Sequence, residues 1–272
     1  MLQDARDYQI LFLSLFLGLG IFTRDWTLQP LIIGVAIATS LTVQLLASLY
    51  IHRRIKPAAS FDPALRSALI TALGLSLLLR TGHWTTMALA ATLAILSKFI
   101  LRVNHKHFFN PANFGIIAVL LFTQDAWVSP GQWGEVGWYG LLFVGAGGIV
   151  LKRVGRWDTT AVFLSTYTLL GAIRNLWLGW SWDVLTHQLM SGSLLLFALF
   201  MLTDPRSIPD ARSGRVVWGV AISLLTFVLQ SYFSVTTAIF WALFALAPLT
   251  ILLDGQWLAP RFCWEGKIEH HY

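Results

Sequence analysis

Long apolar runs alternate with short polar segments along the whole chain. A helix needs about 20 apolar residues to span the hydrocarbon core of a membrane, and fewer where its ends reach the polar surface. Ten runs are free or nearly free of charged residues, at positions 8–22, 31–51, 67–79, 84–101, 110–123, 136–151, 160–177, 184–203, 216–233 and 235–253. The pattern therefore predicts an all-α integral membrane protein with about ten transmembrane helices.

The last two runs form one charge-free stretch of 38 residues, from Val216 to Leu253. A continuous helix of this length would measure about 57 Å, nearly twice the thickness of the hydrocarbon core. The chain must therefore turn back once within the stretch. The polar segment 230–234 is its only plausible turn.

Basic residues divide unevenly between the two sides that ten passes define. With the N-terminus inside, 16 of the 19 Lys and Arg residues fall on the inner side, and only Arg24, Arg80 and Arg174 fall outside. Because Lys and Arg are retained on the cytoplasmic side of a membrane, this division predicts that both termini are cytoplasmic. We expect a multi-pass protein of the inner (plasma) membrane.

Composition excludes several classes of protein. Hydrophobic residues make up 56% of the chain and charged residues only 12%, too few for a soluble globular domain. The basic residues are too scattered to form a nucleic-acid-binding face, so the expected partner is the lipid bilayer. The single cysteine, Cys263, excludes an internal disulfide and a cysteine-ligated iron–sulfur cluster of the chain's own. The histidine pairs 105/107 and 270/271 lack the third ligand of a catalytic zinc site.

No flexible linker or soluble domain interrupts the apolar runs. We therefore expect one polytopic membrane domain, 1–272, with a first half at 1–123, a second half at 136–254 and a short cytoplasmic tail at 255–272. The first run is interpreted as a retained helix, because acidic residues precede it and no convincing cleavage site follows it. Five passes in each half would suit the inverted repeat found in many carriers.

Two short Pro-containing motifs are the best candidates for a binding site. Asn110-Pro111 and Asp204-Pro205 each resemble a helix start, in which a polar residue caps the helix and Pro occupies its first turn. Both lie on the predicted cytoplasmic side. Two helix N-termini facing one cleft would hold carbonyl oxygens or an anionic group, although the spacing alone favours the simpler interpretation of two well-capped helix ends at a loop.

The same motifs carry a resemblance to a known family. The segment 108–115, Phe-Phe-Asn-Pro-Ala-Asn-Phe-Gly, resembles the "FNPA" segment of the RnfD/NqrB family. Ser191-Gly192-Ser193, followed by Phe-Met-Leu-Thr-Asp-Pro at 200–205, resembles its "FMATDP" segment. These proteins are membrane subunits of the Rnf and sodium-pumping NADH:quinone oxidoreductase complexes. The resemblance implies ten helices, two inverted five-helix halves and a fold related to that of urea transporters.

One departure from the family concerns its covalent flavin. RnfD and NqrB usually carry FMN on the threonine of a "SGAT" segment in an outside loop, but the corresponding residues 124–135 contain no threonine. Ser129 offers a hydroxyl without the surrounding pattern. We therefore expect no covalent FMN, and the resemblance leaves a non-covalently bound riboflavin or FMN, or a quinone, as the redox group.

The resemblance also suggests roles for individual residues at that group. Asn110 and Asn113 are candidate amide partners for ring carbonyls, Asp204 a candidate acceptor for a ring N–H, and Lys106 a candidate counter-charge to a reduced ring; helix capping or ion pairing is the structural alternative for Asp204. On this interpretation the chain is an electron-transfer protein. It would be a subunit of a membrane oxidoreductase and would have other redox subunits as partners. The alternative is a channel or carrier for a small polar solute on the same fold.

Overall fold

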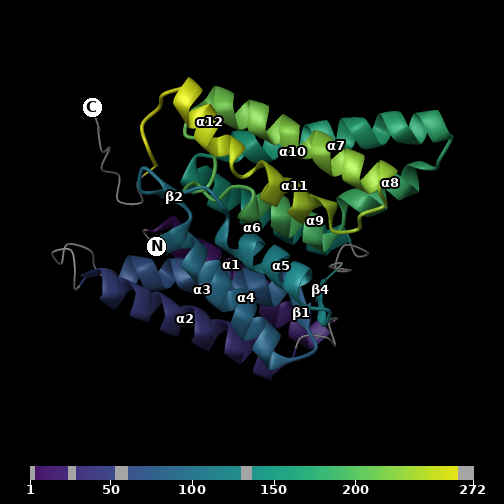
Figure 1. Ribbon diagram of the computed structural model, residues 1–272. Helices are drawn as coiled ribbons and strands as arrows, with labels where there is room; N and C mark the ends of the chain where they lie inside the picture. Colours follow the sequence, from purple (N-terminus) through teal and green to yellow (C-terminus); the bar gives the residue numbers. More distant parts are fainter. Residues whose placement is uncertain (1–3, 24–28, 53–60, 130–136, 263–272) are drawn as a thin grey trace. The chain divides into compact units, whose positions relative to one another are not determined.

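A computed structural model of the chain describes all residues except 1–3, 24–28, 53–60, 130–136 and 263–272. Each of the predicted apolar runs coincides with a helix or with a pair of consecutive helices (Figure 1). Within the described residues, the remaining regular structure is limited to short strand pairs. The prediction of an all-α protein is therefore confirmed at the level of fold class. The chain divides into two compact units, one formed by residues 1–102 and 111–129 and the other by residues 103–110 and 130–272.

Unit 1 is a bundle of five helices. They are α1 (Ala5–Thr23), α2 (Pro30–His52), α3 (Phe61–Leu78), α4 (Trp84–Ile100) and α5 (Pro111–Phe122). α2 packs against α3 and α4, α1 packs against α3, and α4 packs against α5. Strand β1 (Leu79–Thr81) pairs antiparallel with β4 (Ala126–Val128), with Arg80 opposite Trp127. The strand pair joins the end of α3 to the segment that follows α5.

Unit 2 is less regular. Its helices are α6 (Gly137–Val154), α7 (Trp157–Leu178), α8 (Trp182–Leu189), α9 (Gly192–Leu196), the π-helix η2 (Phe197–Met201), α10 (Arg212–Tyr232), α11 (Ala238–Leu246) and α12 (Leu249–Gln256). α10 packs against α7, α11 and α12, while α6 and α7 pack against η2. The strands β2 (Arg102–Val103) and β3 (Lys106–His107) form a hairpin. Its two turn residues, Asn104 and His105, both have positive φ, as a tight two-residue turn requires.

Several helices suit a membrane by length and composition. Within the described residues, α1, α2 and α10 are long and apolar enough to cross one, and the number rises from three to five if each of two bent helix pairs counts as one span. These features identify a multi-pass membrane protein. The bent pairs are α8 with α9–η2 and α11 with α12, each bent by 49°.

The bends correct two predicted spans, while a predicted turn is confirmed. The sequence predicts one continuous helix over 184–203 and another over 235–253, but the first breaks at Met190–Ser191 and the second at Ala247–Pro248. Pro248 lacks the N–H that a continuous helix would need at this position. The predicted turn at 230–234 is confirmed, because α10 ends at Tyr232 and Ser234 has a φ of 54°.

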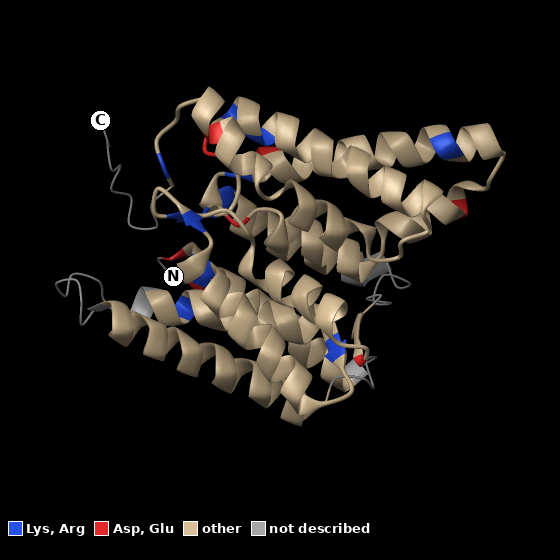
Figure 2. Cartoon of the chain, in the orientation of Figure 1, with Lys and Arg blue, Asp and Glu red and all other residues tan. Residues whose placement is uncertain are grey.

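Charged residues gather at the ends of the helices in each unit, and the middle of each bundle is almost free of them (Figure 2). In unit 2 they concentrate at the end where α10 begins and α12 ends. An uncharged middle with charged ends is the distribution that a lipid bilayer requires. The charged end of unit 2 therefore holds the polar chemistry of this unit.

Candidate functional site

A buried loop connects η2 to α10 in unit 2 and contains the second predicted motif. Asp204-Pro205 does not begin a helix, so that prediction is wrong: the Ser207 N–H donates to the Asp204 carbonyl at 3.0 Å in a turn, and the next helix starts only at Arg212. Pro209 explains the difference, because a helix begun at Pro205 would place a second proline in its interior, without an N–H to donate. The proposed pair of helix N-termini facing one cleft is therefore also wrong.

Side chains from distant parts of unit 2 satisfy backbone carbonyls of η2 and of the loop that follows it. The Asn110 amide donates to the Met201 carbonyl at 3.1 Å, and the Thr160 hydroxyl donates to the Ala198 carbonyl at 2.7 Å. The Thr250 hydroxyl donates to the Ser207 carbonyl at 3.3 Å. Buried backbone groups without a hydrogen bond are costly, so these contacts permit an unwound segment inside an apolar bundle.

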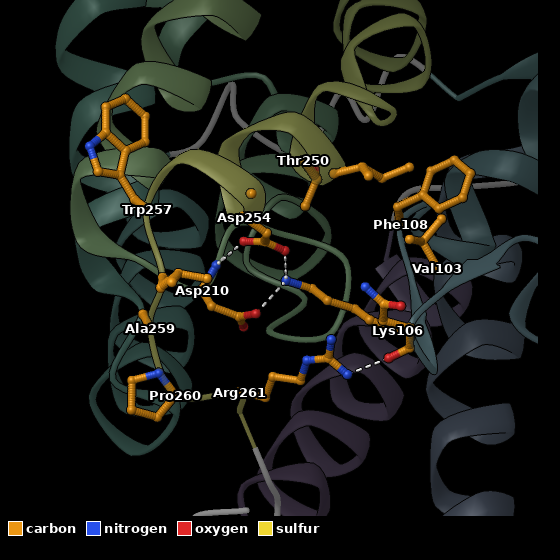
Figure 3. A pocket seen from close by; sticks show the side chains of 14 residues that line it. Val103, Lys106, Phe108, Asp210, Thr250, Asp254, Trp257, Ala259, Pro260 and Arg261 are labelled. Carbon is orange, nitrogen blue, oxygen red and sulfur yellow. Dashed lines mark hydrogen bonds and ion pairs between the residues drawn. The ribbon is translucent and has the colours of Figure 1, made fainter. Parts of the chain in front are cut away.

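Lys106 lies between two carboxylates that come from distant parts of the unit 2 sequence. Its Nζ is 3.0 Å from Oδ2 of Asp210, in the buried loop, and 2.6 Å from Oδ2 of Asp254, in α12. Oδ1 of Asp254 also accepts the backbone N–H of Asp210 at 2.8 Å. We call these three residues the lysine–aspartate triad (Figure 3).

Burial is the strongest influence on the Asp210 carboxyl, and it raises the pKa of that group above its ordinary value. The charge and hydrogen bond of Lys106 act in the opposite direction, and the neighbouring Asp254 carboxylate raises the pKa again. Desolvation of a carboxylate favours its neutral form. Asp210 therefore holds a proton more readily than an exposed aspartate.

The triad lines a cavity of about 550 Å³. Phe108 and Val103 lie on one side of it, Trp257 and Pro260 on another, and Arg261 reaches in from the C-terminal segment (Figure 3). The Arg261 guanidinium donates to the Asn104 carbonyl at the hairpin turn. The cavity thus combines aromatic and aliphatic walls with a few charged groups, as small-molecule sites commonly do.

A second ion pair holds the backbone of the triad in place. The Arg215 guanidinium donates to both carboxylate oxygens of Asp158, with distances of 2.6 to 3.1 Å, and both side chains are almost fully buried. Arg215 and Arg156 both donate to the Asp210 carbonyl, at 2.6 and 2.9 Å. These guanidinium groups therefore fix the position of Asp210 through its backbone.

Asp204 lies at the other end of the buried loop, and its Oδ2 is 3.7 Å from Nε2 of His107. Burial acts to raise the pKa of the Asp204 carboxyl, but the contacts with His107 and with the backbone N–H and charge of Arg206 outweigh it, so that the pKa lies below its ordinary value. The loop therefore holds two aspartates with opposite shifts, and Asp204 is the one that stays ionised.

Lys106 is the predicted site residue that lines the cavity. Pro111 begins α5, as predicted, and Asn113 lies in the first turn of the same helix, in unit 1. The Asn110 amide donates a hydrogen bond to the Met201 carbonyl. Neither Asp204 nor Pro205 is among the described residues that line the cavity. The cofactor contacts suggested for the two asparagines and for Asp204 stay predictions.

Sequence reasoning missed Asp210, Asp254 and the Asp158–Arg215 pair. Asp254 and Lys106 are 148 positions apart, and no local pattern connects them. A signal was nevertheless present: Asp210 and Asp254 lie on the same predicted membrane side as Lys106, next to charge-free runs. Acidic residues at such positions are candidates for pairing with a nearby lysine.

The loop 124–135, which corresponds to the flavin-bearing segment of the family and for which no covalent FMN is predicted, is only partly described. Ser129 is buried, and its backbone N–H donates to the Leu78 carbonyl at 2.8 Å. Residues 130–135 of this loop, and residues 263–272 of the predicted tail, lie outside the described residues. Among the described residues, no group of three or more His, Cys, Asp and Glu side chains could hold a metal ion.

Comparison with known proteins connects unit 2 to one family. A family model described as the NQR2, RnfD, RnfE family matches residues 123–261, about half of the chain. The match includes Asp210 and Asp254, whereas Lys106 and the "FNPA" segment precede it.

Individual relatives are similar over a comparable length, and each is named as a subunit of an ion-translocating oxidoreductase complex. The protein from Halorhodospira halophila is 28% identical over 121 residues, which cover 44% of this chain and 34% of that protein. The protein of the same name from Stutzerimonas stutzeri is 31% identical over 119 residues, covering 42% and 32%. For Escherichia coli O139:H28 the identity is 30% over 137 residues, covering 48% and 36%. The chain thus spans about a third of the length of these curated relatives.

Proposed function

Because the chain belongs to the NQR2, RnfD, RnfE family, we propose that it acts as an RnfD-type membrane subunit of an ion-translocating oxidoreductase, together with other redox subunits. The names of its relatives support this assignment. The apolar helices of both units agree with a membrane subunit. The chain's own contribution to electron transfer is then to bind a redox group and to control its charge.

We propose that the cavity beside the lysine–aspartate triad binds a non-covalent flavin, either riboflavin or FMN, or alternatively a quinone. The supporting observation is a cavity of about 550 Å³ with Lys106 on its wall, which lies within the range of roughly 300–1,000 Å³ that is usual for small-molecule sites. Such a group would supply reversible electron transfer. The absence of threonine from residues 124–135 supports non-covalent attachment.

The lining residues fit a planar group that gains negative charge on reduction. Phe108 and Trp257 offer aromatic faces, which favour stacking with a flat ring. Lys106 and Arg261 bring positive charge to the same cavity, where it stabilises an anionic oxygen or nitrogen. In this role the two cations hold and orient the ligand, and the apolar side chains keep water away from it.

A flavin-binding titration tests this proposal. The full chain, purified in detergent with lipid, should quench the fluorescence of added riboflavin or FMN and release the flavin on denaturation, with no fluorescent band on a denaturing gel. Trp257→Ala and Lys106→Met should each weaken binding about tenfold or more. Trp180→Ala is the matched control, since Trp180 lies at a different part of unit 2, against Arg174, and binding should be unchanged.

A protein that binds neither a flavin nor a quinone analogue would contradict the redox proposal. It would favour the second candidate, a channel or carrier for a small polar solute. The two bent helix pairs of unit 2 support that alternative, because discontinuous helices commonly form the substrate sites of transporters. Solute uptake by proteoliposomes containing the chain would then identify it.

We further propose that the chain crosses the inner membrane ten times, that its halves form an inverted repeat and that both termini are cytoplasmic. The gathering of charge at one end of unit 2 supports the orientation. With Cys263 replaced by Ser, a cysteine at His105 should react with an impermeant maleimide only after the cytoplasmic side is exposed. A cysteine at Trp180 should react from outside, and the reverse labelling would disprove this topology.

A further inference from the structure

The two carboxylates of the lysine–aspartate triad accept different numbers of hydrogen bonds. Asp254 accepts one hydrogen bond on each oxygen, from Lys106 and from the Asp210 backbone N–H. Asp210 accepts the Lys106 ammonium on Oδ2, and its Oδ1 accepts no hydrogen bond from the described part of the chain. Hydrogen bonds to a carboxylate stabilise its charged form. Asp210 thus has one carboxylate oxygen without such a hydrogen bond, whereas both oxygens of Asp254 accept one.

The less satisfied carboxylate is also the more deeply buried one. The side chain of Asp210 is 7% exposed, compared with 23% for Asp254 and 11% for Lys106. Asp210 nevertheless lines the cavity, and its second oxygen is drawn without an interaction in Figure 3. A carboxylate oxygen that reaches a cavity from a largely buried side chain, and accepts no hydrogen bond from the described residues, is a site at which a proton can add.

The neighbouring guanidinium groups bind the backbone of Asp210 instead of this oxygen. Arg156 and Arg215 bond to the backbone carbonyl of Asp210, and Arg215 also pairs with Asp158 through both carboxylate oxygens. Lys106 in turn is shared between the two triad carboxylates. These three cations are thus engaged by other groups as well as by Asp210.

We propose that the lysine–aspartate triad is a proton-binding site, in which the Asp210 carboxylate takes up one proton from water in the cavity and releases it there. On uptake, an O–H bond forms at Asp210 and the site gains one positive charge; Lys106 stays an ammonium and remains paired with Asp254. On release the same O–H bond breaks and the proton returns to water. No oxidant, reductant or bound cofactor is required, so the inference is independent of the proposed flavin or quinone.

Charged groups from every neighbouring element bear on this equilibrium. They are Lys106 and His107 on β3, Arg156 and Asp158 at the start of α7, Asp204 and Arg206 in the buried loop, Arg212 and Arg215 on α10, Asp254 on α12 and Arg261 in the C-terminal segment. The cations oppose protonation and the anions favour it. Because the effect of burial on the Asp210 carboxyl is larger than that of the cations, its pKa is raised.

The raised pKa has a defined consequence for stability. A carboxyl that binds its proton more tightly when folded contributes stability that is fully present below the unfolded pKa of about 3.9 and is lost as the pH rises through the folded pKa. Ionisation of Asp210 thus works against folding. A carboxylate whose only role was to pair with Lys106 would instead have a lowered pKa and would stabilise the fold once ionised.

Infrared difference spectroscopy tests the proposal on the full chain in lipid nanodiscs without added flavin. Between about pH 4 and about pH 8 we expect the carbonyl band of one protonated carboxyl to titrate above the ordinary aspartate pKa of about 3.9. Asp210→Asn should abolish the band. Asp183→Asn, at an exposed position on α8, should retain it.

Two further variants give opposite shifts that a misfolded protein would not reproduce. Asp254→Asn removes a neighbouring negative charge and should lower the midpoint, while Lys106→Gln removes the paired cation and should raise it. Asp210→Glu should restore a titrating band. Persistence of the band in Asp210→Asn, or a midpoint at or below the ordinary value, would overturn the proton site. Either result leaves the flavin titration unaffected, so the two proposals can fail separately.

Discussion

The two units use similar apolar helices in different ways. In unit 1 the helices pack against one another, and its described ion pairs lie at the ends of the bundle: Asp4 pairs with Arg6 and Arg66 at the start of α1, and Asp125 pairs with His83 beside the β1–β4 strand pair. In unit 2 two helix pairs are bent by 49°, one helical segment is a π-helix and a buried loop interrupts the bundle. The carboxylates in and around that loop are those of Asp158, Asp204, Asp210 and Asp254.

Buried ionic groups are expensive in an apolar bundle and usually mark function. π-Helical segments likewise occur frequently at functional sites. Within its described residues, unit 1 shows that apolar helices of this composition pack without a π-helix. The π-helix and the unwound buried loop both belong to unit 2, where most of the residues matched by the family model also lie.

The largest effect is expected from a substitution in the Asp158–Arg215 pair, which tests how much this buried ion pair stabilises unit 2. Arg215→Met removes the buried cation that pairs with Asp158, whose remaining cationic neighbour is the exposed Arg212, and also removes a donor from the Asp210 carbonyl. Loss of one partner of a buried pair typically costs about 3–5 kcal/mol. We expect a large fall in the unfolding temperature of the purified protein, measured by the fluorescence of its tryptophans.

A matched control separates burial from charge. Arg212 begins α10, one turn before Arg215; its side chain is 74% exposed, and its Nε is 3.9 Å from Oδ2 of Asp158. Arg212→Met should therefore change the unfolding temperature little. If the two variants were equally destabilised, the special role assigned to the buried pair would be incorrect.

Local patterns predicted most of the helices. Each apolar run became helical because lipid cannot solvate backbone groups, which must therefore bond to one another within a helix. The start of α5 at Pro111 also follows from local chemistry, since proline suits the first position of a helix. The turn after Tyr232 was required by length alone.

Long-range hydrogen bonds decided what local patterns could not. Asp204-Pro205 resembles a helix start, yet Pro209 opposes a helix there. Hydrogen bonds from Thr250, Arg156 and Arg215 then satisfy carbonyls of the unwound segment. The same folding brings Asp210 and Asp254 to Lys106. A single sequence contains no information on such pairings until the packing of the helices is known.

Two glycines, one in each unit, lie where neighbouring helices approach closely. Gly115 lies in the "FNPA" segment in unit 1, and a Cβ built on it would be 2.5 Å from the Ala90 carbonyl oxygen and 2.9 Å from the Ala94 Cβ. Gly147 lies in the Gly-rich stretch of α6 in unit 2, where a Cβ would be 2.8 Å from side-chain atoms of Leu199. Gly148 has no atom within 4 Å of its built Cβ.

We therefore expect Gly115→Ala to be the most destabilising of three alanine substitutions. The backbone of α4 cannot move aside without separating two helices, so overpacking of about 1–3 kcal/mol is expected. A rotamer change of Leu199 moves its δ carbons but not its Cβ, which is also 2.8 Å from the built atom. Gly147→Ala should therefore destabilise the protein too, but less than Gly115→Ala, whose closest contact is a backbone oxygen at 2.5 Å. Gly148→Ala should be neutral or slightly stabilising, because alanine favours a helix by up to about 1 kcal/mol over glycine. Unfolding temperatures in the reverse order would show that α4 accommodates the added methyl group more easily than Leu199 does, and would contradict this prediction.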